Sequence, residues 1–218
     1  MEFTQALQAR HSIRDFSSQP VAIETLTAIV AAAQQTPSWA NAQPWQVVIA
    51  TGATLKKIRA TFSQRTQQGV ASSADIEVAH RTNWAASPRR NMADWSNDLS
   101  QYLMQKNVGT REYGATQLSL FNSPAVVYLT VPAPLNSWEI FDTGAFAQTL
   151  MLSAADHGVQ SMPAYELVKY PDELRRLLGL DSTQQLLMGI GLGYASDAAI
   201  NDFRTSRVAT LAMLTLKD

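Results

Sequence analysis

The chain has 218 residues, of which 46% are hydrophobic and 16% charged, and its formal net charge is −1. These values are typical of a globular protein with one sizeable core, and they give no basic field for nucleic acid or a membrane surface. No apolar run approaches the roughly 20 residues that span a bilayer. The opening MEFTQALQAR lacks the basic-then-apolar pattern of a signal peptide, so we expect a cytoplasmic protein without a membrane partner.

Cysteine is absent, which excludes disulfides, thiolate nucleophiles and iron–sulfur clusters. His11, His80 and His157 are scattered and show no metal-ligand spacing. Redox chemistry in this protein would therefore need an organic cofactor.

Apolar spacing predicts several helices. Phe3, Ala6 and Leu7 fit a short amphipathic helix, and residues 23–34 fit a second one that Pro37 limits. Residues 143–157 fit a helix that Asp142 would cap and Gly158 would end. Its apolar residues cover more than one face, which fits either a subunit interface or a central core helix. Pro171 begins a short helix that ends before Gly179.

Short β-branched and apolar runs predict strands at 45–50, 124–131 and 186–194, and the loosely alternating tail 207–216 is a candidate last strand. Residues 63–117 are polar and weakly periodic, and we expect irregular helices there that cover a site. Helices and strands interleave without a βαβ rhythm. We therefore predict one α+β domain, residues 1–218, with a mixed sheet.

The heptad RHSIRDF places Arg10, Ser12 and Arg14 at every second position. In an extended segment these side chains point to the same side, about 6.6 Å apart along the chain. A phosphate monoester is a candidate ligand, because arginine pairs bidentately with phosphate oxygens. The alternative is a basic surface turn beside Asp15, and the heptad alone does not exclude it.

The segment TPSWANAQPWQ sets Ser38, Asn41 and Gln43 between two prolines, just ahead of a predicted strand. Hydroxyl and amide groups held in this way suit the edge of a flat heterocycle, which needs both donors and acceptors. The alternative is a capped helix-to-strand loop, where serine and asparagine are common.

Two further segments lie near the C-terminus. GIGLGYASD, residues 189–197, lacks the third glycine of a dinucleotide fingerprint and no helix follows it closely, so its glycines indicate a strand that a helix or ligand approaches. NDFRTSR contains Arg204 and Arg207. Arg207 would add a third positive group to the phosphate site if it folded back beside Arg10; otherwise the pair is solvated.

In this order and spacing the four segments resemble the FMN-dependent nitroreductase family. That family's pattern opens with R-x-S-x-R or R-x-S-x-K, continues with P-S-x-x-N-x-Q-P-W, and ends with a glycine-bearing strand and an N-x-x-R-x-x-R-like close. The resemblance runs from residue 2 nearly to the end and is weakest between 63 and 117. It implies a largely antiparallel sheet flanked by helices, in an entwined homodimer whose C-terminal segments pair with the partner's sheet.

The resemblance also implies which residues bind FMN. Arg10, Ser12 and Arg207 would bind its phosphate, and His11 would lie along the phosphate–ribityl side unless it only makes a local turn hydrogen bond. Arg14 would lie near the pyrimidine edge, where a fixed cation stabilises the negative charge of reduced flavin. The implied set is Arg10, His11, Ser12, Arg14, Pro37, Ser38, Asn41, Gln43, Pro163, Glu166, Arg204 and Arg207.

The resemblance also implies how two groups of these residues meet the flavin. Ser38, Asn41 and Gln43 would reach the flavin of the other subunit. Pro163 and Glu166 match a Pro-then-Glu-Gly run that meets flavin N5 in many members, but PAYEL has an extra residue and no glycine. Which backbone N–H faces N5 therefore stays open.

The implied reaction is reduction of nitroaromatics or quinones with electrons from NADH or NADPH, in ping-pong order and without a nucleophilic side chain. The variable helical cover, roughly 63–117, would set substrate choice. Its Arg89, Arg90, Arg111 and Tyr113 are candidates to meet an acidic aromatic, although the arginines fit solvated helix residues better. Two runs, LFNSPAVVYLTVP and FDTGAFAQTLMLSAADHGVQ, look like the branch that includes nitrobenzoate reductases.

Other functions remain open at this point. The same fold hosts azoline dehydrogenation, reductive dehalogenation and oxygen-dependent flavin cleavage. A flavin-binding protein without enzymatic activity is a second class, and an interaction domain that has lost its cofactor is a third. The intact arginine–serine and serine–amide motifs argue against the third class.

Overall fold

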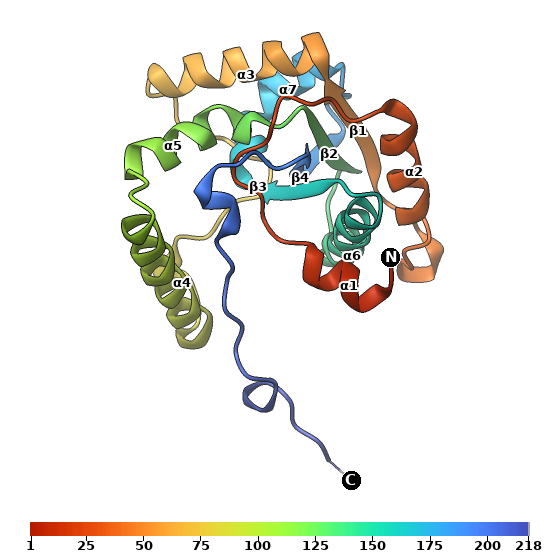
Figure 1. Ribbon diagram of the computed structural model, residues 1–218. Coiled ribbons are helices and arrows are strands. Elements are labelled where there is room, and N and C mark those ends of the chain that lie inside the picture. The colour runs from red at the N-terminus through yellow and green to blue at the C-terminus, as the bar shows by residue number, and fades with distance from the viewer. Residues whose placement is uncertain (218) are drawn as a thin grey trace.

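Four strands form the centre of the protein, whose residues 1–217 are described by a computed structural model (Figure 1). The sheet order is β1-β2-β4-β3, and every pairing between these strands is antiparallel. The parallel component in the described chain is one isolated bridge, between Ser12 and Ser161. The α+β prediction is confirmed. The strand bounds are Gln46–Thr51 for β1, Ala125–Pro132 for β2, Gln160–Ala164 for β3 and Gln184–Gly193 for β4.

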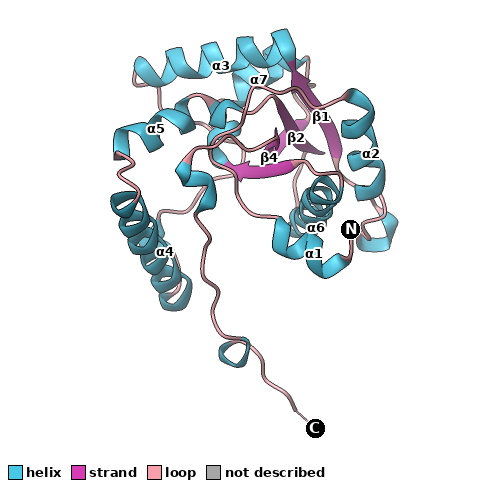
Figure 2. Ribbon diagram, viewed as in Figure 1, coloured by secondary structure: helices cyan, strands magenta, loops and turns pink. Residues whose placement is uncertain are grey.

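Helices cover both faces of the sheet (Figure 2). Alternate residues of β2 point to opposite faces. Val126 and Tyr128 pack with α3 and α7, whereas Val127 and Leu129 pack with α2 and α6. The bounds are Phe3–Ala9 for α1, Ile23–Ala33 for α2, Gly52–Gln67 for α3, Ser137–Asp156 for α6 and Pro171–Leu178 for α7.

The segment 63–117 is more regular than predicted. It holds the end of α3 and two further helices, α4 (Ala86–Gln105) and α5 (Thr110–Leu118), at the left of Figure 1. Leu99 and Leu103 of α4 cluster with Ile200 and Phe203, so a small separate core joins these helices to the C-terminal segment. None of the helices within residues 1–217 is both long and apolar enough to cross a bilayer.

Short 3-10 turns connect the main elements. Two of them, η1 and η3, contain non-glycine residues with positive φ. The turns are η1 (Trp39–Asn41), η2 (Arg81–Asn83), η3 (Leu120–Asn122), η4 (Tyr165–Leu167), η5 (Ala199–Asp202) and η6 (Thr210–Ala212).

The predicted start of α6 was wrong. Asn136 is the N-cap, and its side chain accepts hydrogen bonds from the N–H groups of Trp138 and Glu139. Asp142, the predicted cap, lies buried inside the helix and accepts a hydrogen bond from the N–H of Trp39 at 2.9 Å. The contact with Trp39 thus explains why an aspartate, a residue typical of helix starts, lies inside α6 at position 142.

The structure contains one strand that the pattern did not predict, and it lacks one that the pattern did. β3 includes Pro163, which is tolerated because β3 is an edge strand. The tail 207–216 forms no strand in the described single chain. It leaves the body as an extended segment interrupted by η6 (Figure 1).

The glycines of β4 allow close packing, but the groups that approach Gly191 and Gly193 are side chains of connecting segments and not the helix or ligand that the sequence predicted. A Cβ on Gly193 would lie 2.6 Å from Cδ of Pro124 and 2.9 Å from Cδ1 of Phe16. A Cβ on Gly191 would lie 3.4 Å from Phe16. The bare backbone of β4 therefore seats Phe16, which anchors the opening heptad.

We expect Gly193→Ala to lower the free energy of unfolding by ~1–3 kcal/mol, because the added methyl overlaps the Pro124 ring. Urea unfolding measures this change. Gly114→Ala in α5 is the matched control, because a Cβ there meets nothing within 4 Å. The control should stabilise the protein by up to ~1 kcal/mol through helix propensity. A Gly193→Ala protein as stable as the wild type would contradict the packing described here.

Candidate functional site

The opening and closing motifs meet at one cavity of about 310 Å³. It lies between the end of α1, the heptad and the segment after η5. Arg10, Ser12 and Arg14 all line it, as expected for alternate positions of an extended segment. The complete lining is Leu7, Gln8, Arg10, His11, Ser12, Arg14, Phe203, Arg204, Thr205 and Arg207.

Buried apolar neighbours fix the heptad in place. The N–H of Ile13 donates to the carbonyl of Ser161 in β3 at 3.1 Å, and Ser12 forms the isolated bridge to the same residue. Ile13 and Phe16 are buried, with 1% and 3% of their surface exposed. Since Ile13 faces the core, its neighbours Ser12 and Arg14 are left to face the cavity.

The cavity is strongly positive. Arg10, Arg14, Arg204 and Arg207 line it, no carboxylate does, and none of the four forms an ion pair within residues 1–217. Burial lowers the pKa of the Arg10 guanidinium, and the charge of Arg207 lowers it further. Like charges gathered without counter-charges favour binding of an anion.

Arg14 is the most buried of these arginines, with 4% of its surface exposed. Its Nη1 donates to the carbonyl of Ser12 at 3.0 Å, and its Nε is buried with no partner in the described chain. The guanidinium lies 5.3 Å from the centroid of the Phe203 ring. Burial lowers its pKa, and the nearby Tyr113 hydroxyl offsets part of that effect. An unpaired buried cation is costly, so an anionic ligand would relieve it.

His11 combines the two roles considered from sequence. Its Nδ1 lies 2.8 Å from the carbonyl oxygen of Ala9, which is a local hydrogen bond, while the residue also lines the cavity. Burial lowers its pKa below the ordinary 6.5, and the charges of Arg204 and Arg10 add to the effect. The hydrogen bond to the carbonyl of Ala9 acts in the opposite direction on this pKa.

A second cavity, of about 180 Å³, adjoins the first and shares Arg10 and His11 with it. Met151 and Ala155 of α6 and Ser161 of β3 line its other side. The site thus extends from a cluster of positive charges toward apolar side chains of α6. Such a combination suits an elongated ligand that is anionic at one end.

The second motif lies elsewhere on the molecule. Ser38, Asn41 and Gln43 sit together between α2 and β1, where the N–H of Gln43 donates to Ser38 Oγ at 2.9 Å and its Nε2 to Asn41 Oδ1 at 3.0 Å. Ala40, Asn41 and Gln43 have φ of 45°, 59° and 46°. Left-handed backbone at non-glycine residues is strained and is typical of functional segments. Pro37 precedes this cluster and is exposed.

Exposed aromatic rings surround this second motif. The rings of Trp39 and Trp138 have centroids 4.8 Å apart, and Phe141 lies 6.1 Å from Trp138. These three residues are 60%, 55% and 68% exposed. They form an aromatic cluster that remains exposed in the single chain.

Pro163 and Glu166 do not line either cavity described above. Pro163 pairs with Ile190 inside the sheet, and the Glu166 carboxylate lies 2.7 Å from Nζ of the buried Lys169. Glu166 therefore has a structural role, which is to pair with the buried Lys169. Of the cover residues, Arg89, Arg90 and Arg111 are exposed, whereas Tyr113 lies beside Arg14.

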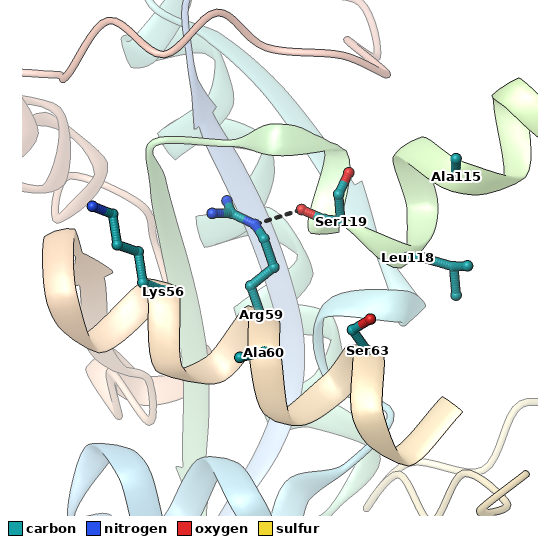
Figure 3. Close-up of a pocket in the computed structure, with 7 residues that line it drawn as sticks. All are labelled: Lys56, Arg59, Ala60, Ser63, Ala115, Leu118 and Ser119. Atoms are coloured by element: carbon teal, nitrogen blue, oxygen red, sulfur yellow. Dashed lines mark hydrogen bonds between the residues drawn. The ribbon is translucent and has the colours of Figure 1, made fainter. Parts of the chain in front are cut away.

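A further cavity, of about 420 Å³, lies between α3 and α5 (Figure 3). Arg59 reaches into this region from α3, but its Nε donates to the carbonyl of Ser119 at 2.6 Å and its Nη2 to that of Ser123 at 2.9 Å. The guanidinium of Arg59 thus binds the backbone on both sides of η3. Across the described chain no group of three or more histidine, aspartate or glutamate side chains is placed to hold a metal ion.

Sequence reasoning missed two residues of the site and left a third without a role. Phe203 lies under Arg14, and Ser161 joins the heptad to β3. Neither has a sequence signal, because both depend on long-range packing. Asn201 belongs to the closing motif, and its side chain accepts a hydrogen bond from the N–H of Arg14 at 2.9 Å.

Comparisons with known proteins agree on one family. A family model described as the nitroreductase family matches residues 7–194. A 4-nitrobenzoate reductase of Pseudomonas putida is 27% identical over 94% of this chain and 91% of its own. The nitroreductase NfnB of Mycolicibacterium smegmatis is 30% identical over 92% and 86%. The crystal structure of the FMN-dependent nitroreductase NfnB from Mycobacterium smegmatis in complex with NADPH has a TM-score of 0.90, with 27% identity and complete coverage of both chains.

Proposed function

Because this chain belongs to the nitroreductase family, we propose that it is an FMN-dependent oxidoreductase that uses NAD(P)H to reduce nitroaromatic compounds or quinones. The observation that carries the proposal is the cavity in which four arginines meet with no carboxylate from residues 1–217 in its lining. A solved relative of the same fold is described as FMN-dependent and as a complex with NADPH.

The residues of the cavity fit FMN. Arg10, Ser12 and Arg207 offer guanidinium and hydroxyl donors for a phosphate dianion, with Arg204 beside them. The buried, unpartnered Nε of Arg14 needs an acceptor, which the pyrimidine edge of a flavin would supply. The adjoining cavity against α6 gives His11 a position between the charged and the apolar ends.

Bound FMN would supply the electron chemistry, because it accepts two electrons from a nicotinamide donor and passes them to an acceptor. The chain's own task is to bind and orient the reactants. Arg14, fixed in a buried position, would stabilise negative charge at the pyrimidine edge. Donor and acceptor would occupy the same place in turn, which is a ping-pong order.

A nitroaromatic acid is a fitting acceptor. The relative from Pseudomonas putida is named as a 4-nitrobenzoate reductase. We place the acceptor under α4 and α5, which act as the cover, because Tyr113 of α5 lies beside Arg14.

In a homodimer, the second motif of each subunit would reach the flavin bound by the other subunit. The surface beside β1 supports such a dimer, because β1 is an edge strand and an apolar groove of about 470 Å³ runs between it and α2. The tail carries the apolar residues that this groove needs, and in the single chain they are exposed. We propose that each tail adds a strand to the partner's β1, since free strand edges recruit extended segments. The exposed tail residues are Val208, Leu211, Met213, Leu214 and Leu216.

We expect deletion of residues 208–218 to weaken or abolish the dimer, because the tail's apolar side chains would no longer fill the partner's groove. Val47→Lys, which places a charge in that groove, should act in the same direction. Sedimentation velocity over a concentration series measures both. A truncated protein that dimerises with the wild-type dissociation constant would rule out the strand exchange.

We expect the double variant Arg10→Ala, Arg207→Ala to bind FMN at least about 100-fold more weakly, since each charge-assisted contact contributes ~1.5–3 kcal/mol. Riboflavin lacks the phosphate, so its affinity should change little. Fluorescence titration of the apoprotein measures both ligands. The exposed pair Arg89→Ala, Arg90→Ala is the control of equal charge. Wild-type FMN affinity in the first double variant would refute the phosphate site.

A further inference from the structure

The side chain of Asn201 connects the two ends of the chain. It is buried, and its Oδ1 accepts hydrogen bonds from the N–H groups of Arg14 at 2.9 Å and Asp15 at 3.1 Å. Its Nδ2 donates to the carbonyls of Asp15 at 2.7 Å and Ser196 at 3.0 Å. An asparagine amide offers two N–H donors and one oxygen with two lone pairs, and all of them are used here.

We propose that Asn201 is a positioning residue that holds Arg14 in place and thereby sets the reduction potential of the bound cofactor. The inference rests on the proposed FMN site. The Oδ1 of Asn201 holds the N–H groups of the peptides on both sides of Arg14, so the backbone from which the guanidinium side chain extends has a fixed position beside the cavity. Electrostatic stabilisation depends on such a fixed charge, because a charge that is free to move must be ordered during the reaction.

The same network keeps a carboxylate away from Arg14. Asp15 follows Arg14 in sequence, yet the two side chains form no ion pair in the described residues. Instead, the Asp15 carboxylate accepts hydrogen bonds from Nδ2 of Asn122 at 2.7 Å and from Oγ of Ser196. An ion pair with Asp15 would offset the positive charge of Arg14, so directing this carboxylate elsewhere preserves the charge for a ligand.

Asn122 belongs to the strained turn η3, which also contacts the backbone of Phe16. Leu120, Phe121 and Asn122 have φ of 54°, 59° and 55°, and the carbonyl of Phe121 accepts a hydrogen bond from the N–H of Phe16 at 2.9 Å. Arg59 donates to the carbonyls on both sides of this turn, as Figure 3 shows for Ser119. Left-handed backbone persists only where its surroundings enforce it. The turn therefore belongs to the same support of the Arg14–Phe16 backbone.

The test compares Asn201→Ala with Thr130→Val in the FMN-loaded protein. Thr130 is buried, and its hydroxyl donates to Oε1 of Gln184 at 3.0 Å, at the start of β4 and away from the cavity, so the loss of this hydroxyl is a structural control. Two quantities are measured for each protein: the thermal midpoint of the apoprotein and the midpoint potential of bound FMN. Ser196→Ala, which releases one donor from Asp15, is the milder variant if Asn201→Ala does not fold.

We expect Asn201→Ala to lower the ratio of reduced to oxidised FMN affinity about tenfold, the size of one charge-assisted contact. For a two-electron couple this is a shift of ~30 mV to more negative potential. Ser196→Ala should shift the potential in the same direction. Thr130→Val should lower the thermal midpoint and leave the potential unchanged.

A wild-type potential in Ser196→Ala would overturn the inference that the Asp15 carboxylate is directed away from Arg14. A wild-type potential in a folded Asn201→Ala protein would overturn the positioning role. It would leave Asn201 as a merely structural residue. A wild-type protein that binds no FMN would overturn the proposed function instead, and this inference with it.

Discussion

The guanidinium of Arg14 is buried against Phe203, and among residues 1–217 its Nε has no partner and it forms no ion pair. The arrangement around the site depends on this buried charge. Desolvating a cation without a counter-charge destabilises a fold unless a ligand supplies the charge. Arg10, Arg204 and Arg207 add to the same imbalance. The protein therefore carries a site that is unfavourable when empty and favourable for an anion, as proteins do where function requires it.

The support of this site comes from ordinary packing. Phe16 packs on the glycine backbone of β4, Ile13 is buried in the core, and Asn201 accepts hydrogen bonds from the N–H groups of Arg14 and Asp15. The contacts of Phe16 with Gly193 and of Asn201 with Arg14 and Asp15 join the opening heptad to residues more than a hundred positions away. The closing motif is thus as much a part of the scaffold as of the binding surface.

The sequence predicted the elements whose signals are local. Three strands were correct to within two residues, and α7 begins at Pro171 and ends before Gly179 as expected. The heptad's alternation also predicted that Arg10, Ser12 and Arg14 share a cavity, and they do. These features depend on residue types within a few positions of one another, where backbone geometry leaves few options.

Features that depend on distant partners were not predictable in this way. β3 is short and contains a proline, so only its place at the sheet edge explains it. Asp142 has the residue type of a cap but binds the N–H of Trp39 from inside a helix. The tail alternates as a strand does, yet in the single chain it has no strand partner among the described residues.

The most direct test of the account is the visible absorption spectrum of the FMN-loaded protein under anaerobic conditions, recorded after NADPH, after NADH and then after 4-nitrobenzoate. The account predicts a flavin spectrum that at least one nicotinamide bleaches and that the nitroaromatic restores. A protein that takes up no FMN would contradict the assignment of the arginine cavity. A bound flavin that neither nicotinamide bleaches would contradict the proposed activity while leaving the binding site intact.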